Sequence, residues 1–192
     1  MITTVTRFFF ISIVFSAAYL NVNAQELKFG IKGGLNIATL GGDKQNVEPR
    51  IGFHAGGFLS VPLVTDFKLQ PEIIYSQQGA QADFGGDEIK YDYLNIPVMA
   101  KYQLIKNLNV QTGLQLGILL SAKEELRGFE IDLKEATRST DLSMCFGLGY
   151  ETDDNIFINV RYNFGFSNTL DIGNDIIDIP NRVIQASLGI AF

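Results

Sequence analysis

The sequence predicts an all-β fold, an eight-stranded antiparallel up-and-down β-barrel that spans a membrane. Three observations predict it. Apolar and polar residues alternate along eight segments, as in strands with one apolar face. Long and short connections alternate between these segments. After residue 24 no apolar run approaches the roughly 20 residues of a membrane-spanning helix, so only strands could cross a membrane.

The composition suits a β-protein whose outer surface is not entirely in water. Charged residues make up 19% of the chain, below the roughly 25% usual in soluble domains, and there are 19 glycines and 15 phenylalanines. The formal net charge of -6 argues against nucleic acid as a partner. Cys145 is the only cysteine, so no internal disulfide can form.

Residues 1–24 have the pattern of a secretory signal peptide. Arg7 supplies a positive charge, residues 8–20 form an apolar run, and Ala24 follows small residues at the cleavage position. A membrane-spanning helix is the alternative, but 13 apolar residues are fewer than the roughly 20 required. We therefore expect a signal peptide at 1–24 and one β-barrel domain at 25–192.

The alternation places the strands one after another along the domain. Each has 11–14 residues, enough for a tilted crossing that takes roughly 9–11. The predicted strands cover 27–38, 50–61, 67–78, 93–104, 108–121, 140–151, 156–167 and 182–192.

The first three strands alternate throughout, with two prolines at informative positions. The second strand ends before Pro62, and Pro71 lies on the apolar face of the third. A proline is tolerated in a strand only where its missing N–H is not needed. In the fourth strand the parity of the faces changes, so that Leu94, Ile96 and Val98 are apolar-face residues. The fifth follows a short turn at 105–107.

The last three strands complete the barrel. The sixth and seventh are joined by a compact turn at 152–155. The closing strand, 182–192, has one strongly apolar face and ends on Phe192 without a polar tail. Its edge must be paired, and we expect it to pair with the first strand, 27–38.

The connections predict the orientation of the barrel. Long loops follow the first, third, fifth and seventh strands, and short turns follow the second, fourth and sixth. Outer-membrane barrels have long loops outside and tight turns in the periplasm, so both chain ends are expected on the periplasmic side. Within the charged interruption at 123–138, Phe129, Ile131 and Leu133 alternate, which predicts a hairpin that extends beyond the membrane.

The apolar faces are expected to contact lipid. Large residues occupy these faces in nearly every strand, and Tyr75, Tyr102, Tyr150 and Tyr162 suggest an aromatic girdle near the strand ends. The opposite faces carry mostly small polar residues, which suit the narrow inside of an eight-stranded barrel. The alternative is a periplasmic lipocalin-like binder, whose apolar face would point inward.

The inward faces carry charges that are expected to pair inside the lumen, because an isolated buried ion is costly. We expect Lys101 to reach Glu72, and Arg161 to pair with Asp141 or Glu151. Such a set is either a polar file for ions or protons or a plug of salt bridges, and we favour the plug. The candidate lumen cluster comprises Lys32, Arg50, Glu72, Lys101, Asp141, Glu151 and Arg161.

The sequence shows no grouping typical of catalysis or of a bound cofactor. His54 is the only histidine, so neither a histidine-based triad nor a histidine-rich metal site can be assembled, and we expect it to fill the lumen. Asp171, Asp175 and Asp178 lack the glycine and glutamate of a full calcium loop. We expect a non-enzymatic protein without a cofactor or metal.

Several stretches are similar to the small outer-membrane β-barrel "porin family", whose domain also occurs in the PorT-like proteins. The most specific are Tyr-Leu-Asn-Ile-Pro-Val at 93–98 and the terminal stretch at 181–192; others lie at 117–123, 141–151 and 161–168. The resemblance covers 25–192. It implies a barrel inserted by the outer-membrane assembly machinery, which reads a C-terminal aromatic strand and hence Phe192. It implies no catalytic residues.

Together these observations predict an integral outer-membrane protein of a Gram-negative bacterium, exported by its signal peptide. The expected role is structural or one of surface interaction, with a side-chain-filled lumen. The alternatives are a narrow channel or a transport or secretion accessory protein, and the lipocalin-like binder. The expected partners are outer-membrane lipid, the assembly machinery through the C-terminal strand, and extracellular contacts through acidic loops.

Overall fold

A computed structural model describes residues 27–41, 47–82, 88–126, 129–168 and 180–192. The expected signal peptide at 1–24 and the three loop aspartates, Asp171, Asp175 and Asp178, lie outside these ranges. Within them, no helix has the length and apolar character needed to traverse a bilayer.

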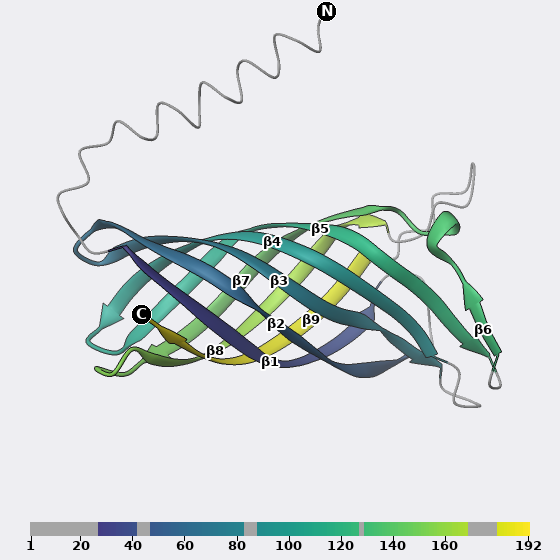
Figure 1. Cartoon of the computed structure of the whole chain (residues 1–192), viewed down its shortest axis with the longest axis horizontal. Helices are drawn as coiled ribbons and strands as arrows, with labels where there is room; N and C mark the ends of the chain where they lie inside the picture. Colours follow the sequence, from purple (N-terminus) through teal and green to yellow (C-terminus); the bar gives the residue numbers. More distant parts are fainter. Residues whose placement is uncertain (1–26, 42–46, 83–87, 127–128, 169–179) are drawn as a thin grey trace, which may run out of the picture.

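The described residues form a closed antiparallel barrel (Figure 1). Neighbouring strands pair around the ring in the order β1, β2, β3, β4, β5, β7, β8 and β9, and the β1–β9 pairing closes it, so the predicted eight-stranded barrel is confirmed. The elements are β1 (Lys28–Leu40), β2 (Val47–Val64), β3 (Phe67–Ala82), β4 (Glu88–Ile105), β5 (Leu108–Leu126), β6 (Phe129–Asp132), the 3-10 helix η1 (Lys134–Ala136), β7 (Thr140–Glu151), β8 (Ile156–Asn168) and β9 (Pro180–Ala191).

The expected seam between the first and last strands is present. β1 and β9 pair from Gly30 with Ala191 to Leu40 with Asn181. The seam continues past β9, because the N–H of Phe192 donates to the carbonyl oxygen of Phe29 at 2.7 Å. The C-terminus and the start of β1 therefore lie at the same end of the barrel (Figure 1).

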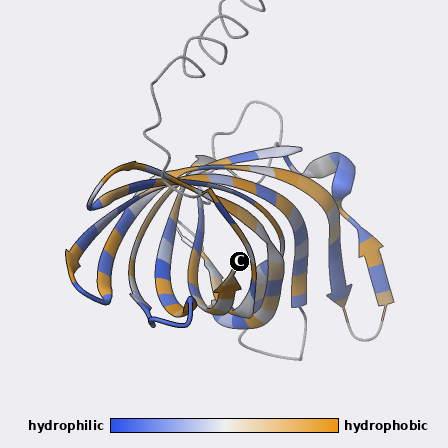
Figure 2. Cartoon of the chain, turned by 60° about the vertical axis from the view of Figure 1, so that its left-hand side comes forward, coloured by the Kyte–Doolittle hydropathy of each residue, from blue (hydrophilic) through white to orange (hydrophobic). Residues whose placement is uncertain are grey.

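The apolar side chains face outward, as predicted. Ile31, Ile51 and Leu114 are 60%, 70% and 57% exposed, whereas the inward Asn36 and Gln185 are almost completely buried. Orange and blue bands alternate along the strands in Figure 2 for the same reason. An apolar outer wall around a polar interior is the inverse of a lipocalin, so the lipocalin-like alternative is wrong.

The strands project beyond the apolar band at the loop end. β4 begins at Glu88 and β5 runs to Leu126, several residues beyond the predicted 93 and 121. β6 pairs with the end of β5, so the predicted extended hairpin is confirmed. In Figure 1 β6 lies at the end of the barrel opposite the C-terminus.

The predicted aromatic girdle is present only in part. Tyr102 and Tyr150 lie near the turn end of their strands, and Tyr75 is the last apolar outward residue of β3 before Gln77. Tyr162 lies in the middle of β8 instead, because this strand continues outward to Asn168 with further aromatic residues.

The lumen is apolar at both ends, which the alternation did not predict. At the turn end the rings of Phe58 and Phe157 meet edge to face at 5.4 Å beside Ala191. At the loop end a second buried cluster contains Leu40, Ala80, Tyr91, Tyr93, Leu119 and Ala122. Polar and charged side chains fill the space between these two layers.

A charged lumen as the candidate functional site

The centre of the lumen is a carboxylate held by two cations. Glu72 on β3 accepts two hydrogen bonds from Arg161 on β8, at 2.8 and 2.7 Å. Lys32 on β1 donates to the same carboxylate at 2.6 Å. The three side chains are essentially inaccessible to solvent. This bidentate pair and its additional lysine are short, charge-assisted contacts of the strong kind.

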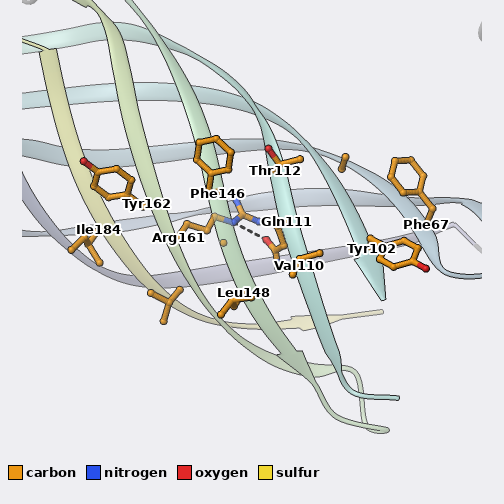
Figure 3. A pocket seen from close by; sticks show the side chains of 13 residues that line it. Phe67, Tyr102, Val110, Gln111, Thr112, Phe146, Leu148, Arg161, Tyr162 and Ile184 are labelled. Atoms are coloured by element: carbon orange, nitrogen blue, oxygen red, sulfur yellow. Dashed lines mark hydrogen bonds between the residues drawn. The ribbon is translucent and has the colours of Figure 1, made fainter. Parts of the chain in front are cut away.

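A ring of amides surrounds this centre and connects it to other strands. Gln70 donates to Glu72 at 2.7 Å and accepts from Lys101 at 3.1 Å. Arg161 also donates through Nε to Gln111 on β5 at 2.9 Å, the dashed line in Figure 3. Every charged group at the centre is thereby hydrogen-bonded, which a buried ion requires.

The expected pairings were therefore wrong in detail. Lys101 reaches Glu72 only through Gln70 and also lies 5.5 Å from the ring centre of Phe157. Arg161 takes Glu72 as its partner, on the opposite wall, rather than an acid on β7 next to it. The reason is geometric: inward side chains of a narrow barrel cross the lumen as readily as they reach a neighbouring strand.

His54 fills the lumen, as predicted, and organises a second network beside the centre. Its ring nitrogens lie 2.8 Å from Asn36 Oδ1 and 2.8 Å from Ser187 Oγ. Asn36 in turn accepts from Gln185 at 3.0 Å and donates to Ser76 at 3.0 Å. This network joins β1, β2, β3 and β9 from the inside.

The other members of the predicted cluster lie at the two rims. Arg50 pairs with Glu88 at 3.5 Å near the loop end, and Glu151 pairs with Lys68 at 3.7 Å near the turn end. Asp141 is buried and accepts from Ser143 at 2.7 Å. Of the seven predicted residues, the structure brings Lys32, Glu72, Lys101 and Arg161 together.

Sequence reasoning missed the amides that connect the cluster. Gln70 and Gln111 are buried on the inward faces of β3 and β5, and their position in the alternation was the available signal. Four buried asparagines have side-chain atoms without a protein partner in the described part of the chain: Asn95, Asn159, Asn163 and Asn181. Buried amides of this kind are positions for internal water.

The arrangement fills the middle of the lumen with paired charges. A bidentate ion pair crosses it, and apolar layers lie above and below. Within the described ranges no three histidine, cysteine, aspartate or glutamate side chains gather where they could hold a metal ion. The outer wall near the same position has an apolar groove of about 690 Å³, bordered by Tyr102, Phe146 and Tyr162, which faces lipid (Figure 3).

Comparison with solved structures supports the fold. Neisserial surface protein A is similar over 88% of this chain and 100% of its own, with 12% identity and a TM-score of 0.60. Ail, the attachment invasion locus protein of Yersinia pestis, is similar over the same shares, with 16% identity and a TM-score of 0.57. A second Ail structure, in complex with the heparin analogue sucrose octasulfate, has a TM-score of 0.56 at 16% identity, again over 88% and 100%. No curated protein sequence matches the chain.

The family comparison gives the assignment. A family model described as "Outer membrane protein beta-barrel domain" matches residues 23–171, most of the chain. With the lipid-facing apolar wall and the closed ring of strands, this match establishes where the protein lies. The chain belongs to the outer membrane protein β-barrel domain family and is an integral protein of the Gram-negative outer membrane.

Proposed function

We propose that this protein is a plugged, non-conducting barrel that acts through the surface it presents outside the cell. The observation that carries the proposal is the contact of Arg161 with Glu72 across the middle of the lumen. Transport through the barrel would require both side chains to leave a fully satisfied buried pair, which costs several kcal/mol. A structural or surface-interaction role requires no such opening.

The loop end offers a surface suited to contact. The β5–β6 hairpin extends past the apolar band, and its exposed Phe129 and Ile131 are 77% and 44% accessible. Lys123 and Glu130 tie its two strands together at 2.9 Å. The hydrogen bond and charge of Lys123 hold the pKa of Glu130 below its usual range. Large exposed apolar side chains outside lipid are typical of interaction surfaces.

The charge of this hairpin points to the class of partner. Across residues 123–132 four acids, Glu124, Glu125, Glu130 and Asp132, outnumber two bases, Lys123 and Arg127. One of the similar structures, Ail, is named for attachment and was solved with an anionic heparin analogue. An acidic hairpin repels such a polyanion and favours a protein partner with basic residues. We therefore expect this chain to bind a protein partner rather than a sulfated glycan.

Planar-bilayer recording tests the closed lumen. The refolded protein should give no steady single-channel current at neutral pH, because ions cannot pass the paired charges and the apolar layers. Steady unitary currents from the native sequence would instead support the rival function of a narrow channel. The control is a wide porin inserted under the same conditions, which shows that inserted proteins are detected.

Adhesion of bacteria that display the protein tests the surface role. The double substitution Phe129→Ser and Ile131→Ser removes the exposed apolar side chains of β6 and leaves the barrel wall unchanged. Adhesion to surfaces coated with a basic protein should fall, while the amount in the outer membrane stays the same. The matched control is Lys106→Gln in the periplasmic turn. Unchanged adhesion of the double variant would count against a hairpin-based role.

A further inference from the structure

A pocket of about 560 Å³ lies at the outer rim of the barrel, between the upper ends of β5 and β7. Its lining is mixed: leucines form one part, and charged and hydroxyl side chains form the other. The lining residues that matter here are Leu116, Lys134, Arg138, Ser139, Thr140 and Leu142.

The pocket lies at the boundary between the lipid-facing wall and the outer polar rim. Leu116 pairs with Leu142 across β5 and β7, and both point outward with 43% and 47% exposure. β7 begins at Thr140, so above these leucines the wall passes from strand to the segment that contains η1. The lower half of the pocket therefore faces acyl chains and the upper half faces headgroups.

The upper half is held firmly on the barrel. The N–H of Leu133 donates to Ala122 at 2.9 Å, and the N–H of Leu119 donates to Ser139 at 2.8 Å. Between these anchors Thr137 is buried and donates to the carbonyl oxygen of Leu133 at 2.8 Å. The segment that carries the two cations is thus fixed at both ends, so its backbone needs little ordering when a ligand binds.

The cations of the pocket are available to a ligand. Lys134 and Arg138 are exposed, and among the described residues neither forms a salt bridge. Two hydroxyl donors, Ser139 and Thr140, lie beside them. Glu135 also lines the pocket and opposes an anion, so the exposed charged residues of the lining carry a net charge of one positive. The buried Asp141 belongs to the lining as well and offsets this charge at the base of the pocket. Asp141, buried below, is already engaged by Ser143.

We propose that this pocket binds a phosphate-bearing glycolipid of the outer leaflet. Lys134 and Arg138 bind the phosphate, and Leu116 and Leu142 lie against its acyl chains. Cations close to a membrane surface attract anionic headgroups, and an arginine adds paired hydrogen bonds to phosphate. A small soluble anion would satisfy only the upper half. The site goes beyond the proposed function, because it fixes the barrel in its own membrane rather than to a partner.

Native mass spectrometry of the full folded protein in octyl glucoside tests the proposal, with lipid A as the probe. Lipid A with both phosphates should bind at least about tenfold more tightly than enzymatically dephosphorylated lipid A. The double substitution Lys134→Gln and Arg138→Gln should remove this preference. The control Lys106→Gln and Lys123→Gln removes the same charge elsewhere and should keep it. Equal affinity for the two lipids, or a preference that survives in the pocket double variant, would overturn the proposal.

Two further arms separate the outcomes. Glu135→Gln removes the opposing carboxylate and should tighten binding, a gain that a misfolded variant cannot produce. Inorganic phosphate at millimolar concentration should not displace lipid A, since it lacks the chains that contact the leucines. Displacement by phosphate alone, or no gain with Glu135→Gln, would show that the pocket is not a lipid site. Heat-modifiable gel migration verifies that every variant is folded.

Discussion

Arg161 and Glu72 join opposite walls of the barrel through two hydrogen bonds of 2.8 and 2.7 Å, although they are 89 positions apart in the chain. Their strands, β8 and β3, are separated by β9, β1 and β2 on one side and by β7, β5 and β4 on the other. The pair therefore spans the barrel across its full diameter. It opposes any change in cross-section that would separate the two walls, and its stability depends on both charges being present.

Glu72→Gln should be strongly destabilising. The substitution keeps the size of the side chain but leaves Lys32 and Arg161 facing each other without a counter-charge in the buried centre. Breaking a buried ion pair by removal of one partner costs about 3–5 kcal/mol. Urea unfolding in lipid vesicles, followed by far-ultraviolet circular dichroism, measures the free energy of unfolding; the chain has no tryptophan for fluorescence.

Two further variants serve as a control and as a rescue for Glu72→Gln. Glu88→Gln removes a carboxylate from a partly exposed rim pair with Arg50 and should cost less than about 1 kcal/mol. Adding Lys32→Met to Glu72→Gln removes one of the two stranded cations and should recover part of the loss. If the Glu72→Gln protein unfolded at the same urea concentration as the native protein, the ion pair would not contribute to the stability of the barrel.

Gly34→Ala should weaken the seam that closes the barrel, whereas Gly33→Ala should not. A methyl group at Gly34 would overlap the backbone of Ala186 on β9. At Gly33 it would make an ordinary contact with the carbonyl oxygen of His54 at 3.5 Å. We expect Gly34→Ala to cost about 1–3 kcal/mol, as overpacking does, and Gly33→Ala to be neutral or slightly stabilising. Hydrogen exchange of the β1 and β9 amides gives the readout, and equal protection in both variants would contradict a crowded seam.

The ring of strands was predictable because alternation is a local property. Whether Leu94 or Asn95 faces lipid follows from their immediate neighbours, and the structure places both as the pattern indicates. The contact between Arg161 and Glu72 is not local. It depends on the stagger of all eight strands around the ring, which no segment specifies alone. The sequence therefore favoured an acid on the neighbouring strand β7 as the partner of Arg161, and this prediction was wrong.

The apolar ends of the lumen were missed for a related reason. Phe58 and Tyr93 lie on inward faces, where a strict division into apolar-out and polar-in expects polar residues. Each closes the lumen only together with residues of distant strands: Phe58 with Phe157 of β8, and Tyr93 in a cluster that includes Leu40 of β1. The predicted ranges of β4 and β5 were also too short at the loop end, because the alternation of apolar and polar residues weakens once neither face contacts lipid.

Deletion of Phe192 should impair insertion into the outer membrane. The ring of Phe192 lies 5.5 Å from the ring of Phe29 at the turn end of the barrel, and its N–H extends the closing seam. Loss of the ring pair alone should cost about 1 kcal/mol of stability. We expect a larger fall in the amount of inserted protein than this cost explains, because the C-terminal aromatic residue is also the predicted signal for the assembly machinery.

Phe29→Ala separates the anchoring role of Phe192 from its role as a signal. It removes the same ring contact but leaves the C-terminus intact, so purified protein should lose about the same 1 kcal/mol as the deletion. In cells, however, Phe29→Ala should insert at nearly the native level, whereas the deletion should accumulate in the periplasm. Quantitative immunoblots of outer-membrane fractions make the comparison. If the two variants insert equally poorly, the ring contact itself limits assembly and Phe192 is an anchor without a signalling role.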